Sequence, residues 1–261
     1  MRSYTKSNPE KSVSSPRSQK NEIADFGISD ISIKDAGVNY RKEYGEKSPK
    51  TFFVIISGGE VREKNYFKII SKQDKFNRIK IEFVADLNQL NPKGLLATAK
   101  GKQERYKTSQ EDEPDKIFII SDVDHFMKEL LNIKPTCEAS DISLIISNPC
   151  FEIWLYYGKF NQKPDDFIIP ENPLKISQEF KRYLNYKFSG GVTPQRAIFD
   201  IEAAISNSSI NYKEDNNGIP KRFSTNMFRL AEQLLPFIKD ELNKMIAENK
   251  IKKFPFKKRT I

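Results

Sequence analysis

Cysteine and histidine are scarce in this sequence, and their scarcity excludes several kinds of site. The 261 residues include two cysteines, Cys137 and Cys150, and one histidine, His125. Two cysteines do not make a disulfide framework or a zinc ligand set, and one histidine excludes zinc sites built on two or more. We therefore interpret Cys150 as a small buried residue rather than a nucleophile. His125 is interpreted as a surface residue or a neighbour of a ligand, not as a ligand.

Long apolar runs are also missing. No stretch approaches the roughly 18 residues that a membrane-spanning helix needs. Residues 1–20 contain no apolar segment of the kind that signal peptides carry. We therefore expect a cytoplasmic protein. The hydrophobic content of 38% is sufficient for a packed core, and the length allows one large domain or a core with an appendage.

Negative charge is in the minority, with 35 Asp and Glu against 44 Lys and Arg, a formal net charge of +9. An excess of Lys and Arg favours a polyanionic partner such as nucleic acid, because binding releases the counterions of the phosphates. Six basic residues and no acid lie in residues 249–261, so the rest of the chain is nearly balanced. The residues of this tail that we predict to bind nucleic acid are Lys252, Lys253, Lys257 and Lys258.

The order of the predicted elements indicates an α/β fold. Runs rich in β-branched and aromatic residues predict strands at 51–57, 79–85, 115–122 and 142–147. Helices are predicted between them at 62–71, 95–107 and 127–131, and later at 172–187, 194–207 and 225–248. This alternation is typical of a mostly parallel sheet flanked by helices, here followed by a helical C-terminal half.

Four parts follow from this order. We predict a disordered N-terminal segment at 1–47, an α/β core at 48–160, a helical portion packed on the core at 161–248 and a basic tail at 249–261. Asn148 and Pro149 are predicted to begin the helix that continues through FEIWLYY, with Asn148 as its cap. Ser224 or Thr225 is predicted to cap the last helix, and the polar loop 211–223 is predicted to be mobile.

Acidic residues follow three of the predicted strands. Glu60 and Glu63 follow the first strand, Asp122 and Asp124 end the third, and Glu152 comes just after the fourth. Ligand sites in such sheets lie beyond the carboxyl ends of the strands. Oxygen ligands of this kind suit Mg²⁺ or Mn²⁺, which polarise a phosphate and activate water.

Each acidic motif also has a structural alternative. Asp122 or Asp124 can cap a helix that begins at Phe126, and Glu60 and Glu63 can be the solvated first turn of a helix. The turn at Gly58 and Gly59 can instead bring backbone N–H groups to a phosphate.

Two further features bear on binding. Glu152 stands between Phe151 and Ile153, and an acid in such an apolar setting needs a partner or a metal. The segment 180–188 offers basic residues for phosphates and tyrosines for stacking on bases; these are Lys181, Arg182, Lys187, Tyr183 and Tyr186. An amphipathic helix with a solvated basic face explains the same segment.

Taken together, the motifs resemble those of the RloB-like family, a group with a Toprim-type core found in bacterial phage-defence and restriction-linked loci. The motifs that carry the resemblance are GGEVREKNYF (58–67), SDVDHF (121–126), SNPCFEIWL (147–155) and RFSTNMFRLAEQLL (222–235). The resemblance implies a metal-dependent nuclease, often acting with an ATPase partner protein in abortive infection. It makes Asp122 and Asp124 the Toprim acidic pair, and Glu63 the second acid of the first loop. It makes Glu152 the glutamate of the Asn-Pro-Cys-Phe-Glu segment.

The first loop differs from the family's usual pattern, in which a Glu followed by Gly stands where this chain has Gly58 and Gly59. Glu60 is the nearest acid that can serve as a base. Two functions therefore stay open. One is a nuclease that uses Mg²⁺ or Mn²⁺, held by Glu63, Asp122 and Asp124, to cut DNA or RNA, tRNA included. The other is a catalytically degenerate Toprim-like module that binds nucleic acid or a partner protein.

Overall fold

The computed structural model describes residues 51–59, 61–85, 91–109, 112–124, 126–188 and 192–248. The predicted disordered segment and the predicted basic tail lie outside the described residues, as do Glu60 and His125. The fold and the site below are built from the described residues alone.

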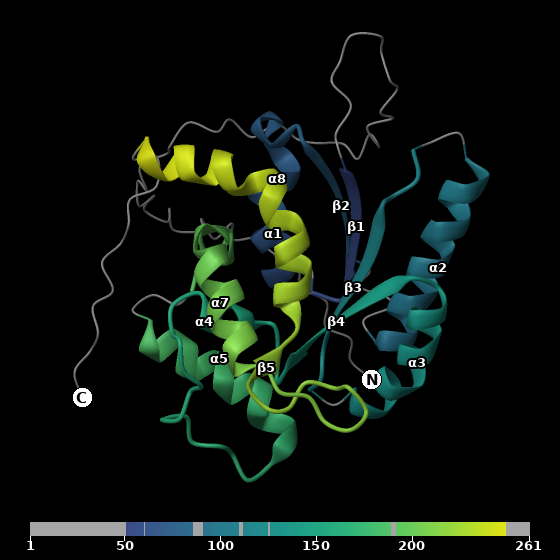
Figure 1. Ribbon diagram of the computed structural model, residues 1–261. Helices are drawn as coiled ribbons and strands as arrows, with labels where there is room; N and C mark the ends of the chain where they lie inside the picture. Colours follow the sequence, from purple (N-terminus) through teal and green to yellow (C-terminus); the bar gives the residue numbers. More distant parts are fainter. Residues whose placement is uncertain are drawn as a thin grey trace, which may run out of the picture. The chain divides into compact units, whose positions relative to one another are not determined.

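A five-stranded sheet organises the described residues (Figure 1). Its strands are β1 (Thr51–Ser57), β2 (Ile79–Ala85), β3 (Lys116–Asp122), β4 (Ile142–Asn148) and β5 (Ser224–Thr225). Their order is β2-β1-β3-β4-β5; the first four are parallel, and the short β5 is antiparallel to β4. The predicted mostly parallel α/β sheet is confirmed, whereas β5 was not predicted, because two residues carry no alternating pattern.

Helices cover both faces of the sheet. They are α1 (Arg62–Lys72), α2 (Pro92–Thr108), α3 (Met127–Ala139), α4 (Glu152–Tyr157), α5 (Ile176–Lys187), α6 (Pro194–Ala197), α7 (Ile201–Asn211) and α8 (Met227–Ala247), with 3₁₀ turns η1 (Asp74–Phe76), η2 (Pro173–Lys175) and η3 (Ile198–Asp200). Helices α2 and α3 lie on one side, and α1, α7 and α8 on the other (Figure 1). Within the described residues, none of the helices combines the length and apolar character needed to cross a bilayer.

The alternation of side chains along β1 explains why helices pack on both faces of the sheet. Phe52 and Val54 pack with Leu95 of α2, and Phe53 and Ile55 pack in the cluster that contains α1 and α8. Because successive strand residues point to opposite faces, a strand covered on both sides is buried along its whole length, as β1 is. This is why its sequence is a continuous apolar run.

The predicted start of α4 is wrong. Asn148 is the last residue of β4, paired with Ser224, and its side chain donates a hydrogen bond to the carbonyl of Pro220 at 2.8 Å. Asn148 therefore belongs to the sheet and does not cap α4. The Asn148–Pro149 peptide is cis, and α4 begins at Glu152.

The predicted cap of α8 is also corrected. Ser224 and Thr225 form β5, and the N-cap position is Asn226. The Asn226 side chain accepts a hydrogen bond from the N–H of Ile146 at 2.6 Å and donates one to the carbonyl of Leu144 at 3.1 Å. The side chain of Asn226 therefore forms hydrogen bonds with the backbone of β4 and does not cap the helix. Thr225 still contributes, since its Oγ1 accepts from the N–H of Met227 at 3.1 Å.

The loop between α7 and β5, predicted to be mobile, is tied down by its own contacts. Asp215 Oδ1 accepts hydrogen bonds from the N–H groups of Asn217 and Ile219, both at 2.9 Å. Ile219 is fully buried in a small apolar cluster with Val123, Leu130 and Ile146. The loop is thus packed against the segment that carries Asp122 and Asp124.

Candidate active site

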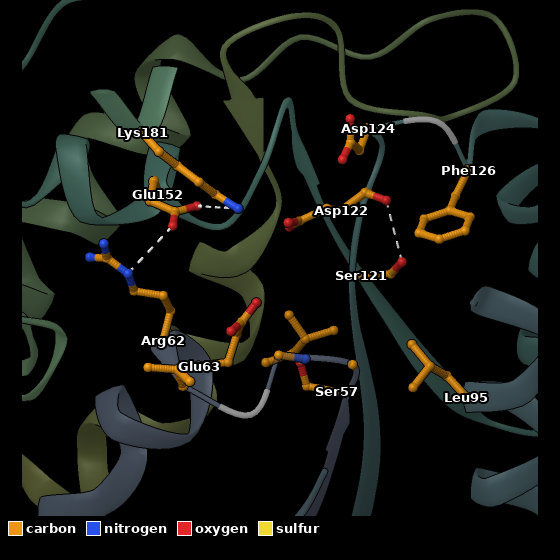
Figure 2. A pocket seen from close by; sticks show the side chains of 14 residues that line it. Ser57, Arg62, Glu63, Leu95, Ser121, Asp122, Asp124, Phe126, Glu152 and Lys181 are labelled. Atoms are coloured by element: carbon orange, nitrogen blue, oxygen red, sulfur yellow. Dashed lines mark hydrogen bonds and ion pairs between the residues drawn. The ribbon is translucent and has the colours of Figure 1, made fainter. Parts of the chain in front are cut away.

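A pocket of about 330 Å³ opens where β1 and β3 end (Figure 2). Its walls come from the turn after β1, the first turn of α1, the end of β3, and single side chains of α4 and α5. The charged residues in its lining are Arg62, Glu63, Asp122, Asp124, Glu152 and Lys181. The fold therefore brings together acids from segments that are 30 to 89 residues apart in the sequence.

Asp122, the last residue of β3, is the most enclosed of these acids. Its Oδ1 atom is buried and has no hydrogen-bond partner among the residues that the structure describes. Burial raises the pKa of its carboxyl well above the usual range, and the neighbouring Glu63 and Glu152 raise it further. Lys181 opposes these effects, and Asp124 adds a smaller increase. In the absence of a cation, the folded protein therefore favours the protonated form of Asp122.

Glu63 lies in the first turn of α1, with only 8% of its surface exposed. Burial raises its pKa, and the charge of Glu152 adds to the increase. Its carboxylate lies against Gly59, in the space that a Cβ at that position would occupy. The turn itself is fixed by Ser57, whose Oγ accepts a hydrogen bond from the N–H of Gly59 at 3.0 Å. The glycine turn therefore makes room for this acid.

Glu152, the first residue of α4, is 3% exposed and faces two cations. Arg62 Nε lies 3.7 Å from its Oε1 and Lys181 Nζ lies 3.9 Å from its Oε2 (Figure 2). Burial lowers the pKa of Lys181, but Glu152 and the other acids raise it by more, so that the net pKa is raised and the amine stays protonated. These two cations are the partners that an acid in an apolar setting requires.

The turn after β3 is held by the neighbouring strand. The N–H of Val123 donates to Ser147 at 2.8 Å, and the N–H of Asp124 donates to Pro149 at 3.2 Å, both to backbone carbonyls. Asp124 has a φ of 28°, which is uncommon for a residue other than glycine. The N-cap position of α3 is Phe126, so neither aspartate occupies the cap position considered above.

The predicted nucleic-acid-binding residues of α5 separate in the structure. Lys181 lines the pocket. Arg182 pairs with Glu179 of the same helix at 2.5 Å, and Lys187 pairs with Asp166 at 2.6 Å. The predicted base Glu60 lies outside the described residues, as do the tail residues Lys252, Lys253, Lys257 and Lys258.

Both cysteines are free and buried, and burial was predicted for Cys150. Burial raises the pKa of the Cys150 thiol well above its usual range, and the charges of Glu152 and Asp122 raise it further. A thiol held in its protonated form is a poor nucleophile. Cys150 therefore contributes packing rather than chemistry at the pocket.

Two features of the site were not found from the sequence. Arg62 was not identified as a pocket residue, and Ile219 was not identified as a support for the acidic turn. Only the apolar setting of Glu152 signalled that a partner was required. Nothing local to Arg62 or Ile219 indicates the contact, because each partner lies on a distant segment.

The donor chemistry of the pocket fits a divalent cation of the Mg²⁺ or Mn²⁺ class. The available donors are carboxylate oxygens, and the buried Oδ1 of Asp122 has no hydrogen-bond partner among the described residues. Within the described part of the chain, however, no three acidic, cysteine or histidine side chains converge on one point. The residues therefore supply suitable ligands without forming a complete ligand set among themselves.

The model of the RloB-like protein family matches residues 53–234, which include every residue of the pocket lining. No curated protein and no solved structure matches the chain.

Proposed function

The chain belongs to the RloB-like family, and we propose that its acidic pocket is the active site of a metal-dependent nuclease of the Toprim type that acts in bacterial anti-phage defence. The observation that carries the proposal is the carboxyl of Asp122. It has a buried oxygen without a hydrogen-bond partner among the described residues, and three other acids surround it. A site that concentrates acids in a buried place is costly unless a cation is bound.

Asp122, Asp124 and Glu63 would hold Mg²⁺ or Mn²⁺ in this proposal. When bound, such an ion polarises a phosphate and lowers the pKa of a water molecule. Glu152 has a different role, because Arg62 and Lys181 already face its carboxylate. It keeps these two cations at the pocket.

Lys181 and Arg62 would contact the phosphate of the substrate. Their ion pairs with Glu152 are long, and 45% and 34% of their side-chain surfaces are exposed. N–H groups are therefore left to donate to the oxygens of a phosphodiester. Arg62 is held in place by a hydrogen bond from its Nη1 to the carbonyl of Val192 at 3.2 Å. DNA and RNA, tRNA included, are the proposed substrates, and an ATPase is the proposed partner protein.

A second candidate function is a catalytically degenerate Toprim-like module that binds nucleic acid or a partner without cutting. Gly58 lines the pocket at the position where the family usually has a glutamate. The incomplete convergence of the described acids is the observation that favours this candidate.

A cleavage assay tests the nuclease. Full-length protein is incubated with single-stranded DNA, duplex DNA, RNA and tRNA in Mg²⁺ or Mn²⁺, beside Asp122→Ala and the surface control Asp240→Asn. Wild type and Asp240→Asn should cleave at least one substrate, and Asp122→Ala should be at least about 100-fold slower. No cleavage by wild type, or equal cleavage by Asp122→Ala, contradicts the nuclease.

The variant Gly58→Glu separates the two candidates. It should create or increase metal-dependent cleavage if one missing acid is what limits the wild type. A variant that binds nucleic acid as the wild type does and still cuts nothing supports the binding module.

A further inference from the structure

Two loops outside the acidic pocket bring three lysines together. Asn211 Nδ2 donates a hydrogen bond to the carbonyl of Asn161 at 2.9 Å, which joins the loop after α4 to the end of α7. In the loop that follows α7, the N–H of Lys221 donates to the carbonyl of Lys213 at 2.8 Å, so these two residues lie side by side. Lys163, on the first loop, lies near enough to feel both charges. We call Lys163, Lys213 and Lys221 the lysine cluster.

Acidic residues lie near the lysine cluster without forming an ion pair with it: Asp165 acts on Lys163, and Lys221 acts on Asp215, through their charges. Within the described residues, no member forms an ion pair or a side-chain hydrogen bond. Other lysines nearby are neutralised: Lys134 pairs with Glu138 at 2.7 Å, and Lys187 pairs with Asp166 at 2.6 Å. The ammonium groups of the cluster are therefore left without a direct ion pair within the described part of the chain.

Burial lowers the pKa of Lys163, and the charges of Lys213 and Lys221 lower it further, against a partial opposing effect of Asp165. Lys213 and Lys221 are exposed, and Lys163 is half-buried. The three ammonium groups thus repel one another while staying open to solvent. An anion bound among them would remove this repulsion.

Packing contacts and a hydrogen bond connect a loop of the lysine cluster to the segments that form the acidic pocket. Its second loop carries Ile219, which is buried in one apolar cluster with Val123, the residue between the two aspartates. The same loop accepts, at the carbonyl of Pro220, a hydrogen bond from Asn148 at the end of β4. In Figure 1 this loop, between α7 and β5, lies beside the end of β4. The loop that carries Lys213 and Lys221 is therefore packed against the acidic turn.

We propose that Lys163, Lys213 and Lys221 form a phosphate-binding subsite that holds the backbone of the nucleic-acid strand whose neighbouring phosphodiester enters the acidic pocket. The inference rests on the proposed function and adds a binding site to it. Lysines suit this task because an ammonium binds phosphate as a point charge. It does not require the fixed two-donor geometry with which an arginine guanidinium binds phosphate. Contacts of this kind position the strand without reading its sequence.

A binding experiment in EDTA tests the subsite without cleavage. Full-length wild type, the triple variant K163Q/K213Q/K221Q and the control K68Q/K72Q/K75Q are titrated with labelled DNA and RNA oligonucleotides over a range of salt concentrations. The control loses the same charge from exposed lysines at the end of α1 and in η1. The loop contacts of Lys213 and Lys221 are made by their backbones, so glutamine preserves them.

In the cluster variant, the plot of log affinity against log salt should be less steep than in wild type by about 2. Each lost phosphate contact reduces the steepness by roughly 0.7 to 0.9. The control should keep the wild-type slope. In addition, bound oligonucleotide should protect Lys163 from acetylation and leave Lys68 reactive. Equal slopes for the two triple variants, or an acidic peptide of matched charge that competes as well as the oligonucleotide, would overturn the subsite.

The outcomes separate this inference from the proposed function. If wild type binds in EDTA with the predicted slopes but never cleaves in Mn²⁺, the nuclease fails and the subsite stands. If wild type cleaves and the cluster variant has an unchanged KM and slope, the nuclease stands and the subsite fails. If wild type does not bind any oligonucleotide in EDTA, the subsite is overturned.

Discussion

The carboxylate of Glu63 lies directly against Gly59, in the space that a methyl group at position 59 would fill. This close approach connects the glycine turn after β1 to the acids of the pocket. A side chain at position 59, two positions after the end of β1 at Ser57, would displace this carboxylate. The contact also gives a way to displace one acid without changing any charge.

Gly59→Ala should weaken Mn²⁺ binding by about 10- to 100-fold, the range seen when a residue that orients a metal ligand is changed. The added methyl group pushes the Glu63 carboxylate out of its place. Calorimetric titration with Mn²⁺ measures the effect. The matched control is Gly101→Ala, in α2, where an added Cβ meets nothing within 4 Å. It should keep the Mn²⁺ affinity and gain roughly 0.5–1 kcal/mol of stability. Wild-type affinity in Gly59→Ala would refute the role given to this contact.

Ile219→Ala should destabilise the protein by about 2–4 kcal/mol, since it removes a fully buried side chain from the cluster beneath the acidic turn. Urea denaturation measures the loss. Ile210→Ala, at a position that is 76% exposed, removes the same atoms and should change stability by no more than about 0.5 kcal/mol. Similar values for the two variants would mean that the loop does not support the turn.

Without metal, the contribution of Asp122 to the stability of the wild type should fall as the pH rises above about 4. In the folded state the pKa of Asp122 is raised well above its ordinary value of 3.8. Between the unfolded and folded pKa values, the folded state therefore holds a proton that the unfolded state has released. Each increase in pH then favours unfolding. Asp122→Asn lacks this contribution, so its stability relative to wild type should increase from pH 4 towards neutrality.

Thermal melts in EDTA at several pH values measure this difference. The pKa of Glu63 is also raised, so this residue makes stability fall with pH in both proteins. Because it is present in both, it does not remove the difference between them. Asp240→Asn is the surface control and should follow the wild type. A difference between Asp122→Asn and wild type that is constant with pH would contradict the burial of this carboxyl.

The elements of the sheet were predictable because their signals are local. The runs at Thr51–Ser57 and Lys116–Asp122 are continuous and apolar, and in the structure they are strands that are largely buried. Helix α3 was predicted too short because it contains Pro135, yet it continues to Ala139. The side chains of Ile133 and Cys137, in the later turns of α3, are buried in the core. This tertiary packing stabilises the helix beyond the point where the local sequence predicts its end.

The site was predictable only in part. The rule that ligands bind beyond the strand ends selects Asp122 and Glu63 from the sequence. It does not show that Glu63 and Glu152 affect the pKa of Asp122 more strongly than Asp124 does. Nor does it place Lys181, whose position at the pocket depends on how α5 packs against α4. Such relationships join segments that are far apart in the chain, and no local pattern encodes them.

The melting temperature as a function of Mn²⁺ concentration tests the account's central claim most directly. A cation that binds only the folded state adds RT ln(1 + [L]/Kd) to its stability, or roughly 2.7 kcal/mol at a hundred times Kd. We predict that Mn²⁺ raises the Tm of wild type and of Asp240→Asn, and that the rise is largely lost in Asp122→Asn. The same variant should melt higher than wild type in EDTA at neutral pH, because it has no buried carboxyl whose pKa differs between the folded and unfolded states. An identical response of Asp122→Asn and wild type to Mn²⁺, including no response in either, would show that the acidic pocket is not a metal site.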